Sequence, residues 1–396
     1  MTDMCPQPPA EAAPGPLDGL LVADFSRVLA GPYATMLLAD LGADVVKVEG
    51  PTGDDTRHWV PPVRDDVGTY YLAINRNKRS IQLDLKDPAD QEVARRLATR
   101  ADVMIHNFKP GGLDKYRLGY AAVSAANPGS VYCSISGFGS AGGAHLPGYD
   151  LLVQGMSGLM SLTGGPDGPP YRAGISVFDV MTGMHSVIGI LAALRHREAT
   201  GEGQHVETNL LSTAMSALVN QTSAYVAGGV VPGRMGNAHL SLFPYEPLAT
   251  GDGDLIVVAG NDGQFRRLAA ALGIPEVADD ERFDSVGRRN DHREELRPLL
   301  LEALSTRSAQ EWFDLLSDAG IPCGPINDVR GGVELAESLG LEPVAMAGGV
   351  PTVRNPIRLS ATPARYDLPP PALDSHGDEI RAWLADDTRP DPQETP

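Results

Sequence analysis

Strand-like and helix-like segments alternate through the first third of the chain, and this alternation limits the fold more than any other feature of the sequence. The apolar segment Leu20–Phe25 predicts a buried strand, Thr35–Leu41 a short helix and Ala43–Glu49 a second strand. Strands separated by a helix at this spacing form parallel βαβ units. We therefore predict an α/β fold with a doubly wound, mostly parallel sheet in a large domain. The alternation continues through strands within Asn75–Leu85, Asp102–His106 and Ser130–Ile135 and a helix over Pro88–Arg100.

The sequence pattern changes after residue 227. A long predicted helix over Leu211–Val226 is followed by the glycine-rich hinge Gly228–Gly236. The strands Tyr245–Ala249 and Leu255–Ala259 are joined by the turn sequence TGDGD, and polar helices follow them. We therefore predict a loose leader at 1–19, a large domain that begins with 20–227 and a smaller α+β domain at 228–335. Over 336–396 we predict a linker and a C-terminal segment that returns to the large domain.

The charge balance and the cysteine content exclude several classes of protein. The 396 residues include 32 Lys and Arg against 51 Asp and Glu, which gives a net charge of −19. This balance argues against a nucleic-acid partner and a membrane surface, and no run reaches the ~18 uninterrupted apolar residues of a membrane span. Only three, widely separated cysteines are present. Neither a disulfide framework nor a metal site is therefore expected, and a cytoplasmic location fits.

The segment Ala173–Leu194 predicts a buried helix with a carboxylate at its start. Its first half is extended and apolar, and Asp179 stands where the helix begins. The residues that follow are apolar on most faces, and Gly201 lies just beyond the last turn. The positive end of the helix dipole is expected to keep the Asp179 carboxylate ionised. Judged from this segment alone, Asp179 is better explained as a plain helix N-cap, which is the commoner role of such an aspartate.

Nucleotide-binding motifs are incomplete, but basic residues favour an anionic ligand. The run Gly137–Gly142 has the spacing of a dinucleotide fingerprint, yet a loop containing Pro147 follows where a helix is required. A nicotinamide cofactor is therefore not expected. The sequence also contains no GxxxxGK[ST] run and no GxSxG run, so neither a P-loop nor a serine-hydrolase elbow is expected. Cations nevertheless gather in loops at the sheet edge where open α/β folds bind ligands, and they favour a phosphate-bearing ligand. They are Arg76, Lys78, Arg79, Lys86, Lys109 and Lys115.

Six blocks of the sequence are informative as a set. They read, in order, VADFSRVLAGPYATMLLADLGADVVKVE, NRNKRSIQLDLK, NFKPGGLDKYRLGY, GYDLLVQGMSGLMSLTG, FDVMTGMHSVIGILAAL and GNDGQF. Together they resemble the class III CoA-transferases, the family of formyl-CoA transferase and carnitine CoA-transferase, over nearly the whole chain. The resemblance implies an enzyme that takes an acyl-CoA thioester and a carboxylic acid, with no permanently bound cofactor and no metal. It also implies a homodimer whose subunits interlock as linked rings.

The resemblance implies that Asp179 is the catalytic aspartate. In the family the carboxylate attacks the acyl-CoA carbonyl to give a mixed anhydride, and the released CoA thiolate then forms an aspartyl-CoA thioester. The acceptor acid is activated by the same steps in reverse. Backbone N–H groups of the loops Gly137–Gly143 or Gly260–Gly263 are candidates to stabilise the oxyanion. By family position, CoA lies against Leu29, Ala30, Leu83, Lys86, Asn107, Phe108, Lys115, Gly137 and Phe138.

The chain departs from the formyl-CoA transferases in ways that bear on its substrates. Leu29 stands where those enzymes have glutamine, and MGNAHLSLFPYE replaces their tetraglycine loop, so oxalate and formyl-CoA are not the expected substrates. The sequence around Asn237 and His239 resembles family members that act on dicarboxylates, which favours succinyl-CoA or another dicarboxylyl-CoA as donor. Tyr149, Asn237 and His239 are the candidates for the substrate pocket.

Two other functions remain open from the sequence. The α-methylacyl-CoA racemases are similar in fold and place a histidine before an aspartate, whereas this chain has Tyr149 before Asp150. One acid/base group of a racemase is therefore missing. A catalytically idle CoA-binding protein is the third alternative, and the intact sequence around Asp179 argues against it.

Overall fold

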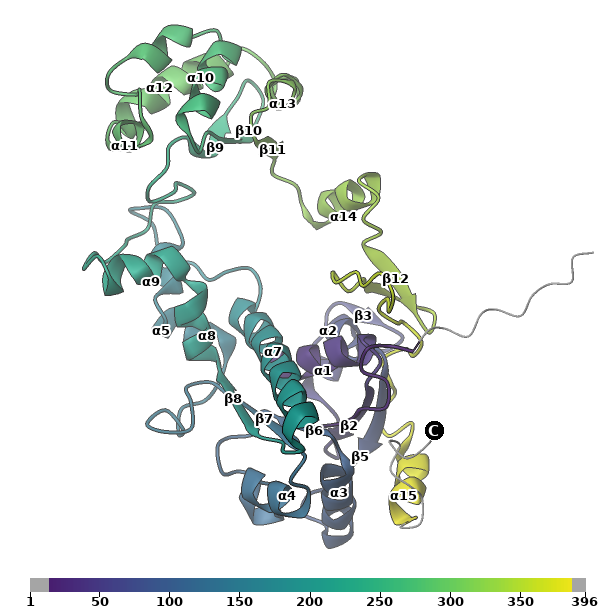
Figure 1. Ribbon diagram of the computed structural model, residues 1–396. Helices are drawn as coiled ribbons and strands as arrows, with labels where there is room; N and C mark the ends of the chain where they lie inside the picture. Colours follow the sequence, from purple (N-terminus) through teal and green to yellow (C-terminus); the bar gives the residue numbers. More distant parts are fainter. Residues whose placement is uncertain (1–13, 387–396) are drawn as a thin grey trace, which may run out of the picture. The chain divides into compact units, whose positions relative to one another are not determined.

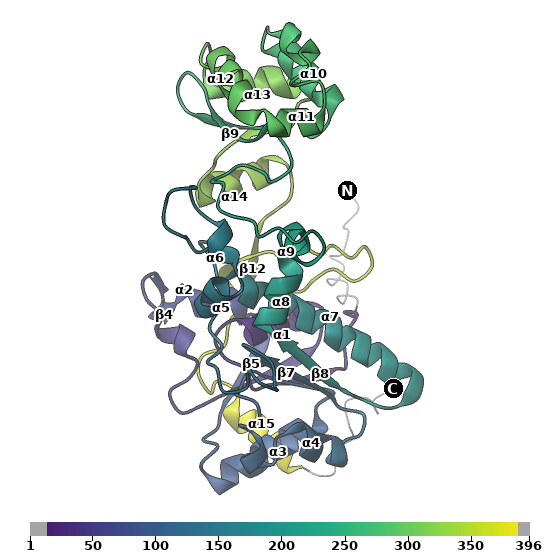
Figure 2. The same cartoon turned by 90° about the vertical axis from the view of Figure 1, so that its left-hand side faces the viewer.

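The computed structural model describes residues 14–386 in two units, and most of the predicted leader at 1–19 lies outside the described residues. The large unit comprises the chain up to Ser157, Gly174–Val219 and the chain from Glu342 onward. The small unit comprises Gly158–Ala173 and Asn220–Leu341. Figures 1 and 2 show the elements of both units.

A six-stranded sheet forms the centre of the large unit. Its strand order is β5-β2-β1-β6-β7-β8, and every pair of neighbours is parallel. The predicted doubly wound α/β fold is therefore confirmed. The strands are β1 (Leu21–Asp24), β2 (Asp44–Glu49), β5 (Lys78–Gln82), β6 (Val103–His106), β7 (Val131–Ser136) and β8 (His205–Asn209).

The strand order reverses direction between β1 and β6. From β1 the chain proceeds to β2 and β5 on one side, and from β6 it proceeds to β7 and β8 on the other. The loops that leave the carboxyl ends of β1 and β6 consequently diverge, and such a switch point is where open α/β sheets bind ligands.

Helices cover both faces of this sheet (Figures 1 and 2). On one face, α3, α4 and α15 pack into a core with apolar residues of the strands, among them Val46, Ile81 and Met104. On the other face lie α1 and α7, which contact each other along their lengths. The helices of the large unit are α1 (Ala30–Asp40), α2 (Thr69–Ile74), α3 (Pro88–Arg100), α4 (Tyr120–Ala126), α5 (Asp150–Met156), α7 (Val177–Thr200), α8 (Leu210–Ala217) and α15 (Gly377–Ala385).

The helix α7 differs from its prediction at its start and on its surface. It begins at Val177, with Ser176 as the N-cap residue, so Asp179 lies in the first turn and is not itself the cap. It ends before Gly201 (φ 79°), as predicted. Its apolar residues are not all buried, because Ile188 is 63 % exposed. By length and composition α7 is also apolar enough to cross a membrane, a test that core helices of soluble proteins pass as well.

The predicted helix Leu211–Val226 is in fact two helices. The helix α8 ends at Ala217 and α9 (Val219–Val226) follows, with Val219 at a φ of 36°. The break coincides with the point where the chain leaves the large unit for the small one.

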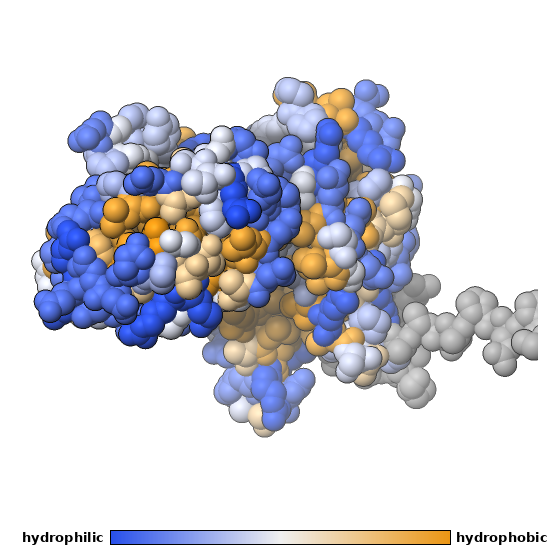
Figure 3. All heavy atoms as spheres, turned by 90° about the horizontal axis from the view of Figure 1, so that it is seen from above, coloured by the Kyte–Doolittle hydropathy of each residue, from blue (hydrophilic) through white to orange (hydrophobic). Residues whose placement is uncertain are grey.

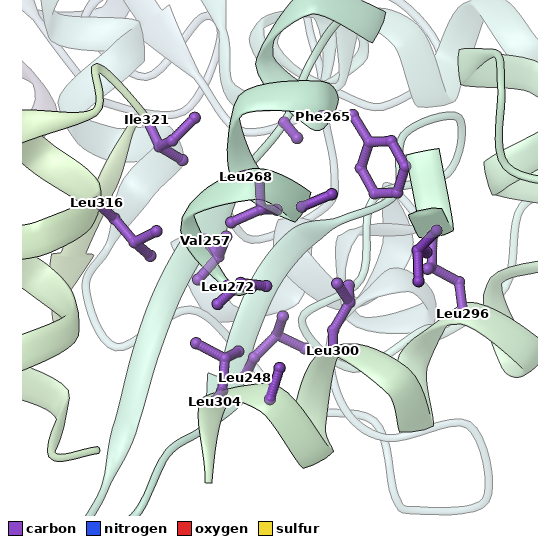
Figure 4. Close-up of a cluster of buried hydrophobic side chains, with 14 of the residues drawn as sticks. Leu248, Val257, Phe265, Leu268, Leu272, Leu296, Leu300, Leu304, Leu316 and Ile321 are labelled. Carbon is purple, nitrogen blue, oxygen red and sulfur yellow. The ribbon is translucent and has the colours of Figure 1, made fainter. Parts of the chain in front are cut away.

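The small unit contains a three-stranded antiparallel sheet and several helices. The strands have the order β11-β10-β9, and the hairpin of β9 (Tyr245–Ala249) and β10 (Asp254–Val258) matches the predicted one closely. Leucines of α10 and α12 point into a shared apolar core with Val257 (Figure 4). The remaining elements are β11 (Cys323–Pro325), α6 (Leu159–Leu162), α10 (Asp262–Ala271), α11 (Val286–Asp291), α12 (Arg293–Leu304), α13 (Ala309–Asp318) and α14 (Val329–Ser338).

The boundaries between the units differ from the predicted 228 and 335. The small unit begins at Asn220 and extends to Leu341, and it also takes in Gly158–Ala173, which the sequence analysis placed in the large domain. This segment joins the small unit because Gly236 donates its N–H to the Gly164 carbonyl (2.9 Å). After Leu341 the chain returns to the large unit, where β12 (Val344–Ala347) and β13 (Val350–Val353) form a short antiparallel hairpin. A second short hairpin of the large unit consists of β3 (Val63–Arg64) and β4 (Val67–Gly68).

Candidate active site

A cavity of about 610 Å³ lies at the switch point of the parallel sheet, entirely within the large unit. Loops that follow β1, β6 and β7 form most of its wall. Its volume is within the range of small-molecule and cofactor sites. The lining includes Arg27, Val28, Leu29 and Ala30 after β1, Asn107, Phe108 and Lys109 after β6, and Gly137, Phe138 and Gly139 after β7.

Hydrogen bonds tie the diverging loops after β1 and β6 to each other. The Asn107 side chain accepts from the Arg27 N–H (3.0 Å) and donates to the Arg27 carbonyl (2.7 Å). On the other side, the Asp54 carboxylate accepts from the Val28 N–H (3.2 Å) and pairs with the buried Lys47 ammonium (2.9 Å). The wall of the cavity formed by the β1 loop is therefore held from both sides.

Asp179 reaches the cavity from the first turn of α7. Helix α1 can lie close against α7 because Gly183 has no side chain, and a Cβ at that position would approach the Ala30 carbonyl oxygen to 2.6 Å. Ala30 is also the first residue of α1 and lines the cavity. The helix contact thus brings the Asp179 carboxylate to the same cavity as the β1 loop.

Asp150 caps the N-terminus of α7 from outside that helix. Its Oδ2 atom accepts from the backbone N–H of Phe178 (2.8 Å) and of Asp179 (3.2 Å). The side chain of the N-cap residue Ser176 makes no capping hydrogen bond. Orphan N–H groups at a helix start need such acceptors, and in this protein α5 provides the acceptor.

The Asp179 carboxyl group has a strongly perturbed affinity for protons. Burial and, after it, the charge of Asp150 raise the pKa of Asp179 to about 7. The expectation that the helix dipole keeps Asp179 ionised is therefore wrong below neutral pH. The physical reason is that burial disfavours the charged form of Asp179, and the negative charge of Asp150 disfavours it further.

The structure brings together most of the residues predicted to contact CoA. Those that line the cavity beside Asp179 are Leu29, Ala30, Asn107, Phe108, Lys115, Gly137 and Phe138, together with the substrate-pocket candidate Tyr149.

Two predicted CoA contacts do not line this cavity, and two substrate-pocket candidates belong to the small unit. Leu83 is buried in the core beneath α3, and Lys86 is exposed to solvent; neither lines the cavity. Asn237 and His239 belong to the small unit, where the His239 ring lies against Tyr245 (5.1 Å between centroids). Their role in the substrate pocket stays a prediction, as does the oxyanion role of Gly260–Gly263 in the same unit.

Three of the cations assigned to an anionic ligand have structural roles. Arg76 pairs with Asp40 (2.6 Å) and Lys78 with Asp24 (3.3 Å), and all four side chains are buried. Arg79 pairs with Asp44 and Glu379. The prediction was wrong for these residues because their partners lie 35 or more positions away in the sequence, where a local pattern does not reveal them. Lys109 and Lys115 do line the cavity.

Sequence reasoning missed several residues of the cavity and its support, among them three lining residues and one residue behind the wall. Arg27, Asp55 and Trp59 line the cavity, and Asp150 orders the start of α7. Arg27 follows the first strand directly, so its position at the carboxyl end of β1 was a usable signal. The role of Asp150 had no local signal, because the helix that it caps begins 27 residues later.

The arrangement can bind an anion and present a carboxylate to it. Arg27, Lys109 and Lys115 supply positive charge, whereas Asp179 has no ion-pair partner among residues 14–386. Cationic side chains of this kind bind phosphate groups. Within the same described range, no three His, Cys, Asp or Glu side chains form a group that can hold a metal ion.

Comparisons with known proteins agree with this geometry. The family model of CoA-transferase family III matches residues 17–377. A succinate–glutarate CoA-transferase of Agrobacterium fabrum is 44 % identical over 97 % of this chain and 98 % of that protein. An acetyl-CoA:oxalate CoA-transferase of Acetobacter aceti is 38 % identical over 97 % and 99 %.

The fold is similar to that of solved structures as well. A CAIB/BAIF family protein from Brucella suis, 44 % identical, has a TM-score of 0.84 over 94 % of this chain and 100 % of that chain. Family match, sequence identity and fold agree with the resemblance seen in the six sequence blocks. The chain belongs to CoA-transferase family III and is a CoA-transferase.

Proposed function

We propose that this CoA-transferase moves CoA from succinyl-CoA, or another dicarboxylyl-CoA, to a free carboxylic acid through covalent intermediates on Asp179. The observation that carries the proposal is the Asp179 carboxyl group, which lines the cavity at the switch point and whose pKa is raised to about 7 by burial and by Asp150. A carboxylate that is poorly stabilised by its surroundings is a better nucleophile.

The proposed steps conserve atoms and charge. An Asp179 carboxylate oxygen bonds to the acyl carbonyl carbon, the C–S bond breaks, and the electron pair leaves with the CoA thiolate. The thiolate then attacks the Asp179 carbonyl of the mixed anhydride and releases the donor as a free carboxylate. The acceptor carboxylate enters by the reverse sequence, so that acyl-CoA forms and Asp179 is regenerated.

The remainder of the cavity suits the CoA portion of the substrate. Lys109 and Lys115 lie on the loop after β6, and Arg27 lies on the loop after β1. Phosphate oxygens of CoA are the expected partners of these cations. CoA binds as a substrate and not as a permanently held cofactor, and no metal enters the proposed steps.

The names of the relatives suggest which acids to compare. The Agrobacterium relative is named for succinate and glutarate, and the Acetobacter relative for acetyl-CoA and oxalate. We favour the dicarboxylyl donor because the succinate–glutarate enzyme is the more similar of the two and because Leu29 replaces the glutamine of formyl-CoA transferases.

Trapping of the activated carboxylate tests the proposal. The protein is incubated with succinyl-CoA or acetyl-CoA in the presence of hydroxylamine, and its peptides are analysed by mass spectrometry. A hydroxamate on Asp179 with succinyl-CoA, and little with acetyl-CoA, is the expected result. Steady-state assays with succinyl-CoA then compare glutarate and oxalate as acceptors.

A racemase would give a different result in these trapping experiments. No trapped species with any donor, together with exchange of the α-hydrogen of a 2-methylacyl-CoA in deuterated water, would contradict the transferase mechanism on Asp179. An idle CoA-binding protein would show neither trapping nor exchange. The Asp179→Ala variant is expected to bind CoA and to transfer none.

We also propose a homodimer in the cytoplasm. Apolar side chains interrupt the hydrophilic surface in the view of Figure 3, and exposed large apolar residues in the described range include Met184 and Ile188 of α7. Apolar patches of this kind mark protein interfaces, and the family resemblance implies interlocked subunits.

The free thiols of Cys133 and Cys323 suit a reducing compartment. Light scattering and cell fractionation test the two statements.

A further inference from the structure

The carboxylate of Asp150 is a buried anion with an unusual set of neighbours. It is 6 % exposed, and its hydrogen-bond donors are the N–H groups of Phe178 and Asp179 and the side-chain amide of Gln154. Among residues 14–386, no Lys, Arg or His side chain forms an ion pair with it. A buried carboxylate without a cation is costly unless it is well hydrogen-bonded. Three hydrogen bonds offset that cost, and two of them come from the first turn of α7, which carries Asp179.

The position of Asp150 is set by its own surroundings. It is the first residue of α5, and Gln154, one turn along, also donates to the Ile175 carbonyl (3.1 Å) just before α7. Before it, Gly148 packs against Gly137 so closely that a Cβ on either glycine would overlap the other backbone. The Asp150 carboxylate is thus fixed between the end of β7 and the start of α7.

This placement has two effects on Asp179. The Asp150 carboxylate fixes the Asp179 backbone through the 3.2 Å hydrogen bond, and it occupies N–H groups that would otherwise stabilise a carboxylate at the helix start. Its negative charge also disfavours a second negative charge nearby. Both effects leave the ionised Asp179 less stabilised than a carboxylate at an open helix N-terminus.

We propose that Asp150 is a positioning residue of the transfer reaction, which orients Asp179 and keeps its carboxylate reactive toward the acyl carbonyl. The inference rests on the function proposed above, in which Asp179 forms a bond to the acyl carbon while the C–S bond breaks. Asp150 itself forms no bond to the substrate and acts only through Asp179.

Arg27, Asp55, Lys109 and Lys115 line the same cavity as Asp179, but Asp150 is the charged group that shifts the pKa of Asp179. Tyr70 of α2 lies near Asp179 and hydrogen-bonds with Ser176, and burial raises its pKa above the ordinary value. Tyr33 of α1 approaches Gly183, one turn beyond Asp179, and burial raises its pKa as well. Of the groups around Asp179, Asp150 is the one that both hydrogen-bonds to the Asp179 backbone and acts on its carboxyl group through charge, so its substitution is the selective test.

The test removes the charge and keeps the shape. In the full-length Asp150→Asn protein, the amide oxygen can still accept from Phe178, but the anion is gone. We expect the acid limb of the kcat/KM profile for succinyl-CoA to move down by at least one pH unit, and kcat at pH 8 to fall about tenfold or more, while the KM for succinyl-CoA changes less than twofold. The charged variant Asp150→Glu is expected to keep the acid limb within a few tenths of a unit of its original position.

Matched controls separate positioning from simple capping. Asp87 accepts from Ala89 and Asp90 at the N-terminus of α3, so Asp87→Asn makes the same change at a helix start away from the cavity, and its pH profile should not move. If Asp150→Asn does not fold, the neutral cap in Asp150→Ser must give the same displacement of the acid limb. A lower rate with an unmoved acid limb in both neutral variants would overturn the inference and leave Asp150 as a structural cap.

Hydroxamate trapping distinguishes failure of this inference from failure of the proposed function. If the unsubstituted protein forms no hydroxamate on Asp179, the proposed function itself is wrong. If it does form one, and Asp150→Asn forms it with the same pH dependence, only the role of Asp150 is refuted.

Discussion

Asp24 is fully buried and Asp179 partly buried in the same unit, yet the pKa values of their carboxyl groups are shifted in opposite directions. Asp24 is fully buried; burial alone would raise its pKa, but Lys78, Lys47 and hydrogen bonds from Ser26 and Thr35 together lower it. Asp179 has no such partners, and burial and Asp150 raise its pKa to about 7. The neighbours of a buried carboxylate, and not its burial, decide whether it serves stability or chemistry.

The two regions also support each other. Lys47 bridges from the buried charge network to the cavity wall, since its ammonium donates to the Ser26 carbonyl (3.2 Å) and to Asp54 (2.9 Å), which in turn accepts from Val28. The buried ion pairs around Lys47 thus hold the loop after β1 in place, and this loop and Asp179 line the same cavity. Functional sites are commonly built in this way, with a satisfied polar network behind a reactive group.

The largest expected effect comes from neutralising the reactive carboxylate. Asp179→Asn keeps the shape of the side chain but removes the nucleophile, so we expect CoA transfer to fall by about 10⁴-fold or more. Calorimetric titration with CoA should show binding within a few-fold of the unsubstituted protein. Transfer at an undiminished rate would exclude Asp179 from the mechanism.

Removing the paired carboxylate should instead damage stability. Asp24→Ala leaves the buried Lys78 ammonium without its anion, and breaking such a buried pair costs about 3–5 kcal/mol of unfolding free energy. Urea unfolding followed by circular dichroism measures the loss. Arg79→Ala breaks a more exposed pair with Asp44 and is the matched control, with an expected cost below about 1 kcal/mol.

Whereas Asp24→Ala should destabilise the folded protein, Asp179→Asn should stabilise it. Because the folded-state pKa of Asp179 lies above the unfolded value, the unsubstituted protein loses stability as the pH rises from about 4 to about 7, where the group ionises. With allowance for partial exposure, the variant should be about 2 kcal/mol more stable at pH 8. The difference should vanish at pH 4, and an equal difference at both pH values would contradict this origin.

The pH dependence of the reaction follows from the same group. Only ionised Asp179 attacks the thioester, so kcat/KM should rise with pH and level off above about 7. Below that value the rate constant should fall about tenfold per pH unit. Stopped-time assays between pH 5 and 9 with succinyl-CoA provide the profile, and an acid limb near pH 4 would show that Asp179 titrates as an ordinary aspartate.

The smallest expected effect concerns the cations at the cavity. Lys115→Ala removes one positive charge from the wall and should raise the KM for acyl-CoA about three- to tenfold, with kcat nearly unchanged. An unchanged KM would separate Lys115 from CoA. The same assay on Lys86→Ala tests a second lysine, which the resemblance assigns to CoA although its side chain does not line the cavity. A similar rise in KM would mean that bound CoA extends past the cavity along the surface.

Local signals in the sequence determined several elements closely. The helix α3 spans Pro88–Arg100 as predicted, because Asp87 caps it and Pro88 suits its first position. The hairpin around Thr250–Asp254 and the end of α7 before Gly201 depend likewise on residues within one turn. The spacing of these elements was enough to indicate the parallel sheet, and the blocks between them indicated the family.

Tertiary structure alone decided how the charged residues are used. The sequence showed Arg76, Lys78 and Arg79 as a cationic cluster, but the fold pairs them with aspartates of other elements. It likewise showed Asp179 as a helix cap, whereas the fold supplies Asp150 as the cap and leaves Asp179 to the cavity. Helix ends and turns are governed by neighbours along the chain. The pKa of a carboxylate depends on charges and burial that only folding brings together, and that difference in range is why the site was only partly predictable.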